Sequence, residues 1–397
     1  MSIISKWKLP SPQPLSQWER GYRYRSWLLL LTTAIGATAI GAVVGNAHPT
    51  KKLSSTTFNH THLLMTQTTN NQEQITNNQH FDYAQCKQQI TNNQHFDYAQ
   101  CKQQITNTST TLRLRSGQAL SAGNQLFLWG ERTYLMGILN VTPDSFSDGG
   151  EFLSLDAASL QGRKMVEAGA DIIDVGGQST RPGATQISLE EELNRVIPVI
   201  KALRSHISVP ISIDTTRARV AEAAIAVGAN LVNDISAGTF DEEMFPRVAQ
   251  LNVPIVLMHI RGTPETMQTL TDYRDLVGEV YQFLEQRIEA AVSAGIERSR
   301  LIIDPGIGFA KTQEQNIELL RRLGELRFLG VPMLVGASRK SFIGHILNRP
   351  EPKERVWGTG AACCRAIAAG ADILRVHDVA PMYDVCRVAD ALWRNNQ

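Results

Sequence analysis

The sequence predicts an α/β fold, a (β/α)8 barrel, preceded by a largely unstructured N-terminal extension. Eight short apolar runs alternate with segments of helical length over about 270 residues after Leu126, which is the size that such a barrel needs. The runs are rich in Val, Ile and Leu, as is typical of parallel strands covered on both faces. Composition changes sharply near Gln125, so we expect two parts, residues 1–124 and residues 125–397.

Each predicted strand ends in glycine or in a polar residue. In chain order the runs are LMGILN, DIIDVGG, PISIDT, LVNDIS, PIVLMH, LIIDPG, PMLVGAS and ILRVHD. The residues at their ends are Asn140, Gly176, Gly177, Asp214, Asn233, Asp234, His259, Asp304, Ser338 and His377. In a closed TIM barrel the carboxyl ends of all strands meet at one mouth, whereas in a doubly wound open sheet, the alternative, they lie along an edge. Polar groups at the strand ends favour the barrel, where they would share one cavity.

The segments between these runs have the periodicity of amphipathic helices. We expect helices over 156–168, 189–203, 218–227, 273–294, 313–326 and 354–369. Glycine follows three of them, at Gly169, Gly228 and Gly370, where a left-handed C-cap would turn the chain towards the next strand.

Residues 1–124 form a low-complexity extension that we expect to be disordered. Its apolar segment, 27–44, is uncharged and follows three arginines, which fits either a membrane span or a signal peptide. The stretch ITNNQHFDYAQCKQQ begins at Ile75 and recurs unchanged at Ile90. Such identity also fits spurious upstream translation of duplicated DNA, so membrane association is expected only if the 27–44 segment is real.

Charge and cysteine content exclude two classes of protein. The 39 Lys+Arg against 38 Asp+Glu leave no basic excess, which argues against a nucleic-acid partner. Five cysteines are too few for a disulfide scaffold and predict reduced thiols in a cytoplasmic protein.

Several strand ends offer ligands for ions. The Asn140 carboxamide oxygen is a hard donor suited to Mg²⁺, although it would equally satisfy loop backbone. The loop over 176–183 combines glycines and hydroxyls with Arg181, whose guanidinium can fork onto phosphate or carboxylate. Several hydrogen-bond donors stand at the mouth, which favours an anion site; they are Ser338 to Ser341, Arg375 and His377. His259 is interpreted as structural.

Asp214, Asn233 and Asp304 supply hydrogen-bond acceptors at three other strand ends. Buried carboxylates need partners, and the amidine edge of a flat heterocycle would satisfy one with two parallel hydrogen bonds. The alternative is a salt bridge that caps the barrel, with Arg217 or Lys311 as the cation.

The motifs GILNVTPDSFSDGG from Gly137 and GGQSTRPGA from Gly176 resemble those of the dihydropteroate synthases, of the pterin-binding family. Further matches are SIDTTRARVA, NDISAG, DPGIGFAKT, GASRKSFIG and RVHDV, so the resemblance covers residues 126–393. It implies a transferase of folate biosynthesis, usually a homodimer. Such an enzyme joins 6-hydroxymethyl-7,8-dihydropterin diphosphate to 4-aminobenzoate and releases diphosphate with the help of Mg²⁺.

The resemblance also implies a role for each matching residue. Asn140 would bind the metal, and the pterin would be bound by Asp214, Asn233, Asp304 and Lys340. The diphosphate would be bound by Thr180, Arg375 and His377. The aminobenzoate would be bound by Thr180, Pro182, Phe309 and Ser341, and Arg181 lies on the same loop as Thr180. Lys340, Arg375 and His377 are therefore the expected catalytic residues. Gln178 stands where many members have Glu.

Two other functions fit the same barrel. A pterin-dependent methyltransferase domain would lack the aminobenzoate loop and the Ser-Arg-Lys-Ser cluster, and both are present. A non-catalytic, membrane-tethered pterin-binding protein is indicated only by the front segment, and the intact site residues argue against it.

Overall fold

The computed structural model describes residues 119–141 and 151–394. One sheet contains the strands β3 (Tyr134–Asn140), β4 (Ile172–Gly176), β5 (Ile211–Asp214), β6 (Leu231–Asp234), β7 (Ile255–Met258), β8 (Leu301–Asp304), β9 (Leu334–Val335) and β10 (Ile373–Val376). Seven of these strands lie inside the predicted apolar runs, and β3 begins one residue before its run, at Tyr134. The predicted strands are therefore confirmed, although β9 keeps only two residues in regular pairing.

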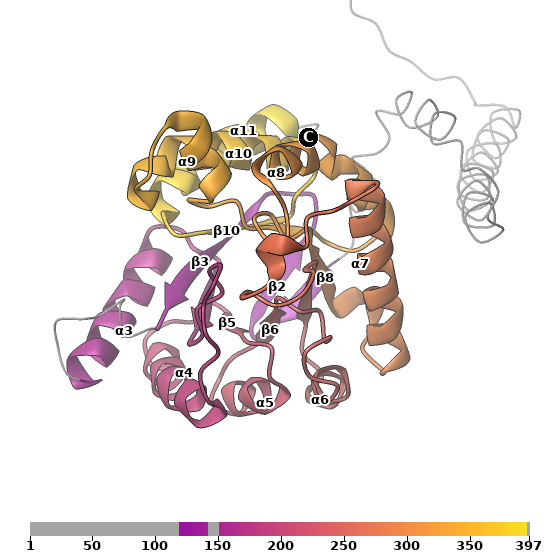
Figure 1. Cartoon of the computed structure of the whole chain (residues 1–397). Helices are drawn as coiled ribbons and strands as arrows, with labels where there is room; N and C mark the ends of the chain where they lie inside the picture. The colour runs from indigo at the N-terminus through magenta and orange to yellow at the C-terminus, as the bar shows by residue number, and fades with distance from the viewer. Residues whose placement is uncertain (1–118, 142–150, 395–397) are drawn as a thin grey trace, which may run out of the picture. The chain divides into compact units, whose positions relative to one another are not determined.

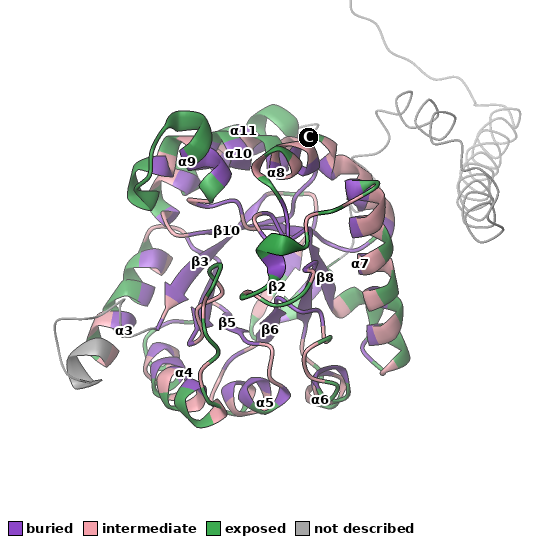
Figure 2. Cartoon of the chain, viewed as in Figure 1, coloured by how far each residue is buried: buried purple, intermediate pink, exposed green. Residues whose placement is uncertain are grey.

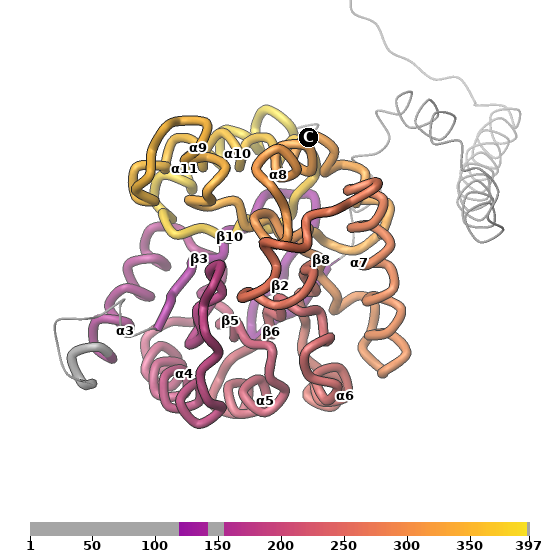
Figure 3. The backbone as a smooth tube through the Cα atoms, viewed as in Figure 1, coloured from indigo at the N-terminus to yellow at the C-terminus, as the bar shows by residue number. Residues whose placement is uncertain are grey.

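All eight strands are parallel, and their order is β8-β7-β6-β5-β4-β3-β10-β9. A bridge between Ile303 and Met333 joins the two ends of this sheet, and the amide of Ile303 donates to the carbonyl of Pro332 at 2.9 Å. The strands therefore close into a barrel (Figure 3). This confirms the predicted (β/α)8 fold, and the open-sheet alternative is wrong.

Helices surround the strands (Figure 1). They are α3 (Glu151–Glu167), α4 (Leu189–Arg204), α5 (Ala218–Ala226), α6 (Met244–Leu251), α7 (Leu276–Ser293), α8 (Gln313–Arg322), α9 (Ser341–Leu347), α10 (Val356–Ala368) and α11 (Val379–Trp393), with short 3-10 turns at Met267–Thr269, Arg298–Arg300, Leu323–Leu329 and Pro352–Arg355. The helices bury their inner faces and expose their outer ones (Figure 2). None of the helices described here combines the length and apolar character needed to cross a bilayer.

A hairpin closes the N-terminal end of the barrel. It consists of β1 (Ala119–Ala122) and β2 (Gln125–Leu128), which are antiparallel. The fully buried Phe127 stacks on Trp129, with ring centroids 5.8 Å apart, and both pack among the first inward residues of the strands, such as Tyr134 and Ile172. The strand β1 lies within residues 1–124, so folded structure begins before Gln125. The apolar segment 27–44 and the repeats lie outside the described residues.

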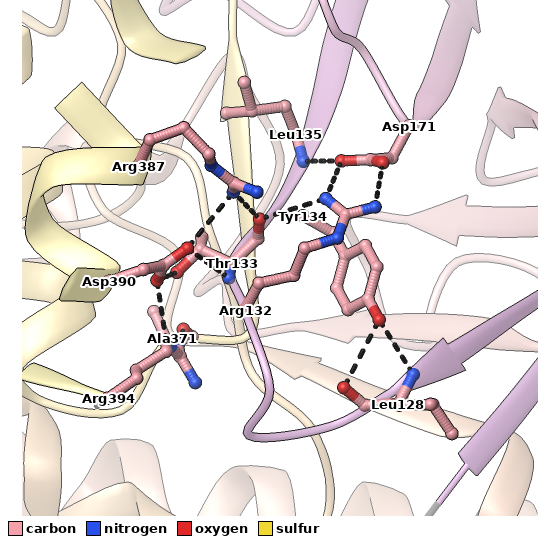
Figure 4. Close-up of polar contacts among 10 residues, drawn as sticks. All are labelled: Leu128, Arg132, Thr133, Tyr134, Leu135, Asp171, Ala371, Arg387, Asp390 and Arg394. Carbon is pink, nitrogen blue, oxygen red and sulfur yellow. Dashed lines mark hydrogen bonds and ion pairs between the residues drawn. The ribbon is translucent and has the colours of Figure 1, made fainter. Parts of the chain in front are cut away.

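Polar contacts hold the start of β3 at the same end (Figure 4). Asp390 of α11 accepts hydrogen bonds from the Thr133 amide at 2.8 Å, from its hydroxyl at 2.6 Å, and from Arg394 Nε at 2.9 Å. Arg132 forks onto both carboxylate oxygens of Asp171, at 3.0 and 2.6 Å. The C-terminal helix is thereby fixed to the first strand of the barrel.

Candidate active site

The opposite, C-terminal end of the barrel contains a polar cavity. Side chains alternate along a strand, so the inward positions continue from the apolar floor to the strand ends. The cavity is lined by Thr180, Asn233, Ile235, Met258, Asp304, Ile307, Phe309, Gly336, Lys340 and Arg375. Six of the residues that the sequence nominates, each from a different loop or strand, thus lie around one space.

Arg375 is at the centre of the hydrogen bonds in this cavity. Its Nε donates to Asp174 Oδ2 at 2.6 Å, and its Nη2 donates to Asp214 Oδ2 at 2.6 Å. Asn233 Nδ2 donates to the same Asp174 oxygen at 3.1 Å. Burial would lower the pKa of Arg375, but the two carboxylates hold it above its usual value, so the guanidinium stays charged.

Burial shifts the pKa values of the carboxylates in the opposite sense. Desolvation raises the pKa of Asp214 to about 7, although the positive charge of Arg375 opposes this. Desolvation also raises the pKa of Asp304 to about 6, against a hydrogen bond of 2.8 Å from the Gly306 amide. In both carboxylates, burial therefore favours the neutral form.

Lys340 contacts Phe309 in the wall of the cavity. It is the residue before α9, and its Nζ lies 4.2 Å from the centroid of the Phe309 ring. Burial, together with the positive charge of Arg375, lowers the pKa of Lys340 to about 8. Gly308, at φ +84°, allows this approach, because a Cβ there would lie 2.8 Å from Lys340 Cδ.

His377 and Ser341 lie beside the cavity but do not line it. The His377 amide donates to Ser338 Oγ at 3.1 Å, and its ring Nδ1 lies 3.0 Å from the same oxygen. Burial, together with the charge of Arg339, lowers the pKa of His377 to about 3, so the imidazole is neutral at physiological pH. Ser341 is exposed at the first position of α9.

The loop after β4 carries Thr180, Arg181 and Pro182. Thr180 lines the cavity, whereas Arg181 and Pro182 are exposed. The Gln178 carboxamide closes this loop: Nε2 donates to the carbonyls of Ser179 and Thr185, both at 3.0 Å, and Oε1 accepts from the Ile187 amide at 2.9 Å.

The cations proposed as salt-bridge partners for the strand-end carboxylates bind other groups. Arg217 pairs with the buried Glu192 at 2.6 Å. Lys311 Nζ lies 2.9 Å from His259 Nδ1 and donates to the carbonyls of Gly306 and Phe309, both at 3.0 Å. That alternative was wrong in its choice of cation, because Arg375 pairs with Asp214 instead.

Asn140 stands at the end of β3, beside Asp214. Asn140 Oδ1 and Asp214 Oδ2 border one small space, since a Cβ on Gly176 would lie 3.7 and 3.5 Å from them. Among the described residues, no three or more His, Cys, Asp or Glu side chains gather as metal ligands. The loop after Asn140, residues 142–150, lies outside the described residues.

Asp174 is the site residue that sequence reasoning missed. It is fully buried and stands two residues before the end of β4, one pleat below the positions nominated from strand ends. Asp174 lies two residues before Gly176, and alternate residues of a strand share a face, so the sequence could have predicted that it points into the barrel.

Comparison with known proteins assigns the chain to a family. A family model described as pterin binding enzyme matches residues 136–377. The chain belongs to the pterin binding enzyme family. Asn233, Asp304, Lys340 and Arg375 of this pterin binding enzyme all lie inside the matched region.

Individual relatives match along almost their whole length. The chain is 64% identical over 275 residues to the dihydropteroate synthase of Synechocystis sp., covering 69% of this chain and 95% of that protein. A solved structure of Xanthomonas albilineans dihydropteroate synthase with 4-aminobenzoic acid has a TM-score of 0.65 and 46% identity over 69% of this chain and 98% of that one. Another, in complex with 7,8-dihydropteroate, has a TM-score of 0.62 and 43% identity over the same shares.

Proposed function

We propose that this pterin binding enzyme is a dihydropteroate synthase, a transferase of folate biosynthesis. It condenses 6-hydroxymethyl-7,8-dihydropterin diphosphate with 4-aminobenzoate to give 7,8-dihydropteroate and diphosphate. The observation that carries this proposal is the convergence of Asn233, Asp304, Lys340 and Arg375 on one buried cavity, in a chain 64% identical to a dihydropteroate synthase.

The cavity has the groups that a pterin ring requires. The ring presents an amidine edge, an N–H beside an amino group, which a carboxylate binds with two parallel hydrogen bonds. Asp304 offers such a carboxylate on the cavity wall, and Asn233 adds an amide. Asp214 and Lys340 complete the proposed pterin site. The apolar thioether side chain of Met258, which also lines the cavity, would lie against the ring.

Diphosphate departure needs positive charge more than it needs a nucleophile. Cleavage of a carbon–oxygen bond beside an electron-rich dihydropterin runs through a stabilised cation, so the enzyme must accept the developing negative charge. Arg375 and Lys340 supply fixed positive charges, while His377 and Thr180 supply hydrogen bonds. These residues are the catalytic assignments that we propose.

The donor set near Asn140 fits magnesium. Mg²⁺ prefers hard oxygen ligands and keeps several for water and phosphate, which agrees with one carboxamide beside one carboxylate, Asp214. When bound, the ion would neutralise charge on the diphosphate oxygens. Asn140 is the proposed protein ligand.

The amine substrate would enter from the exposed side of the cavity. Thr180 and Phe309 line the cavity, and we assign them to the aminobenzoate site together with the exposed Pro182 and Ser341. The exposed Arg181, on the same loop as Thr180, is a candidate partner for the aminobenzoate carboxylate. The weakly basic amine then needs orientation more than activation, since proximity alone supplies much of the rate.

Turnover by the full-length chain tests this function. Purified enzyme is incubated with both substrates, with and without Mg²⁺, and dihydropteroate is measured by chromatography. We expect product formation that requires the metal. Methyl transfer from a methylated folate without dihydropteroate would favour the methyltransferase alternative, and pterin binding without turnover would favour the non-catalytic one.

We also propose a homodimeric, cytoplasmic protein in which an extension, residues 1–124, precedes the barrel domain, residues 125–397, and contributes β1 of the hairpin to it. Large apolar side chains are exposed on the neighbouring helices α10 and α11: Trp357, which is 81% exposed, and Val388, Leu392 and Trp393. A patch of this kind is typical of an interface. Sedimentation of the full chain and of Trp357→Glu would test whether this face joins two copies.

A further inference from the structure

We infer that Asp174 is a positioning residue for the proposed reaction: it fixes Arg375 and Asn233 beneath the substrate, and it remains the partner of Arg375 when Asp214 binds the pterin. The inference rests on the proposed function, to which it adds a residue that touches no substrate.

One oxygen atom joins three strands at this point. Asp174 Oδ2, from β4, accepts from Arg375 Nε of β10 at 2.6 Å and from Asn233 Nδ2 of β6 at 3.1 Å. The carboxylate sits on a paired, fully buried segment, where its neighbours across the sheet are Ile138 and Ser212. The carboxylate of Asp174 therefore fixes the side chains of Arg375 and Asn233 at the same depth in the barrel.

The two carboxylates around Arg375 stand at different depths. Asp174 pairs in register with Ser212, so Asp214 is one pleat nearer the mouth. Asp214 also borders the space of Asn140, where substrate and metal would bind. Once Asp214 turns to these ligands, its hydrogen bond to Arg375 weakens. Asp174 lies below the cavity and has no such competing ligand, so it keeps the guanidinium oriented.

The second oxygen of Asp174 provides a built-in control. Oδ1 has no hydrogen-bond partner among the described residues, nor has the hydroxyl of Ser212, the neighbour in register. In Asp174→Asn the amide oxygen would take the place of Oδ2, because Arg375 and Asn233 both present N–H groups to it. The new NH2 group would then stand where Oδ1 stood. This variant keeps both hydrogen bonds and removes only the charge.

The test compares full-length Asp174→Ala, Asp174→Asn and Ser212→Ala. We expect Asp174→Ala to lower kcat about 100-fold, the scale on which a misplaced active-site group acts, with KM for 4-aminobenzoate changed less than about threefold. Inhibition by inorganic diphosphate should weaken about tenfold. Asp174→Asn and Ser212→Ala should stay within about fivefold of the wild type in all three measurements.

A double-mutant cycle separates positioning from a purely structural role. If Asp174 acts through Arg375, then Asp174→Ala/Arg375→Ala should be no more than about threefold slower than Arg375→Ala alone. Should Asp174→Ala not fold, Asp174→Leu, of similar shape but without an acceptor, takes its place. Thermal unfolding of each variant identifies those that are folded.

Three results would overturn the inference: Asp174→Ala with a kcat within about threefold of the wild type, Ser212→Ala as impaired as Asp174→Ala, or fully additive losses in the cycle. Calorimetric titration of inorganic diphosphate with Mg²⁺ gives a readout that needs no turnover. A wild type that makes no dihydropteroate would therefore refute the proposed function and still leave the anchoring of Arg375 measurable.

Discussion

The two ends of the barrel use charged residues in opposite ways. At the N-terminal end, Asp390 accepts from the Thr133 amide and hydroxyl and from Arg394, and apolar rings of the hairpin fill the space beside it. At the C-terminal end, Asp304, Lys340 and Arg375 line one cavity, and Arg375 is hydrogen-bonded to two further carboxylates, Asp174 and Asp214. The first arrangement stabilises the fold, and the second prepares a site for a charged ligand.

The directions of the pKa shifts show that the arrangement at the C-terminal end lowers the stability of the fold. Burial raises the pKa values of Asp214 and Asp304 and lowers that of Lys340, in each case towards the neutral form. A folded state that disfavours the charged form loses stability at pH values where the unfolded chain is charged. Residues at the mouth are therefore expected to reduce stability while they serve binding, and residues at the floor to do the reverse.

The largest effect is expected at the floor. Phe127→Ala should lower the free energy of unfolding by about 3–5 kcal/mol, because it empties a fully buried site that Trp129 and Tyr134 line. At a temperature where the variant is folded, kcat/KM should be unchanged. Denaturant unfolding and steady-state kinetics measure the two quantities. The exposed neighbour Leu126→Ala is the control, and lost activity in folded Phe127→Ala would contradict the separation of the two ends.

The next largest effect is expected in catalytic activity, on substitution of Lys340 at the mouth of the barrel. Lys340→Ala should lower kcat/KM about 100-fold or more, which is roughly 2.7 kcal/mol of transition-state stabilisation. Its unfolding free energy should fall by no more than about 1 kcal/mol, the value of the contact with Phe309. Exposed Lys353→Ala serves as the matched control. Near-normal turnover by Lys340→Ala would show that its assignment is wrong.

The eight strands and the mouth could be predicted from the sequence because local patterns specify them. An apolar run that ends in Asp or Asn marks both a buried strand and its C-terminal end, as at Asp214, Asn233 and Asp304. The hairpin was missed because two four-residue strands show too little alternation to be distinguished from a loop. Its burial comes from the barrel floor, which no local pattern describes.

Ion pairing within the site could not be read from the chain. Arg217 and Lys311 stand near the carboxylates in sequence, yet the cation that binds Asp214 is Arg375, 161 residues away. Only the closure of the barrel brings β5 and β10 to face each other across the interior. The resemblance nominated residues that would touch substrate, and so it did not include Asp174, which contacts Arg375 and Asn233.

The third effect is on stability, and it is expected at Asp304, a buried residue at the mouth of the barrel. The pKa of Asp304 is raised from 3.8 to about 6, so between these values the folded chain binds a proton that the unfolded chain has lost. Stability therefore falls as pH rises through this window, and the penalty is complete above pH 6. Asp304→Asn should be more stable than the wild type by up to about 3 kcal/mol at pH 8, and the difference should nearly vanish at about pH 4.

Unfolding in denaturant at several pH values would measure this difference. Asp156→Asn, the same substitution at an exposed position, is the matched control. The same Asp304→Asn variant should lose pterin affinity, which a titration by fluorescence would detect. A stability gain that was independent of pH would contradict desolvation as its cause.

The smallest effect is expected where the mouth meets solvent. Gln178 donates to two carbonyls and accepts from the Ile187 amide, so a carboxylate of the same shape would keep one hydrogen bond and face two carbonyl oxygens. Gln178→Glu should loosen the loop that carries Thr180, with a loss of about 1 kcal/mol. KM for 4-aminobenzoate should rise roughly 3- to 5-fold while kcat is unchanged. Gln186→Glu adds the same charge to an exposed position of the same loop, so an equal rise there would assign the effect to charge instead of hydrogen bonding.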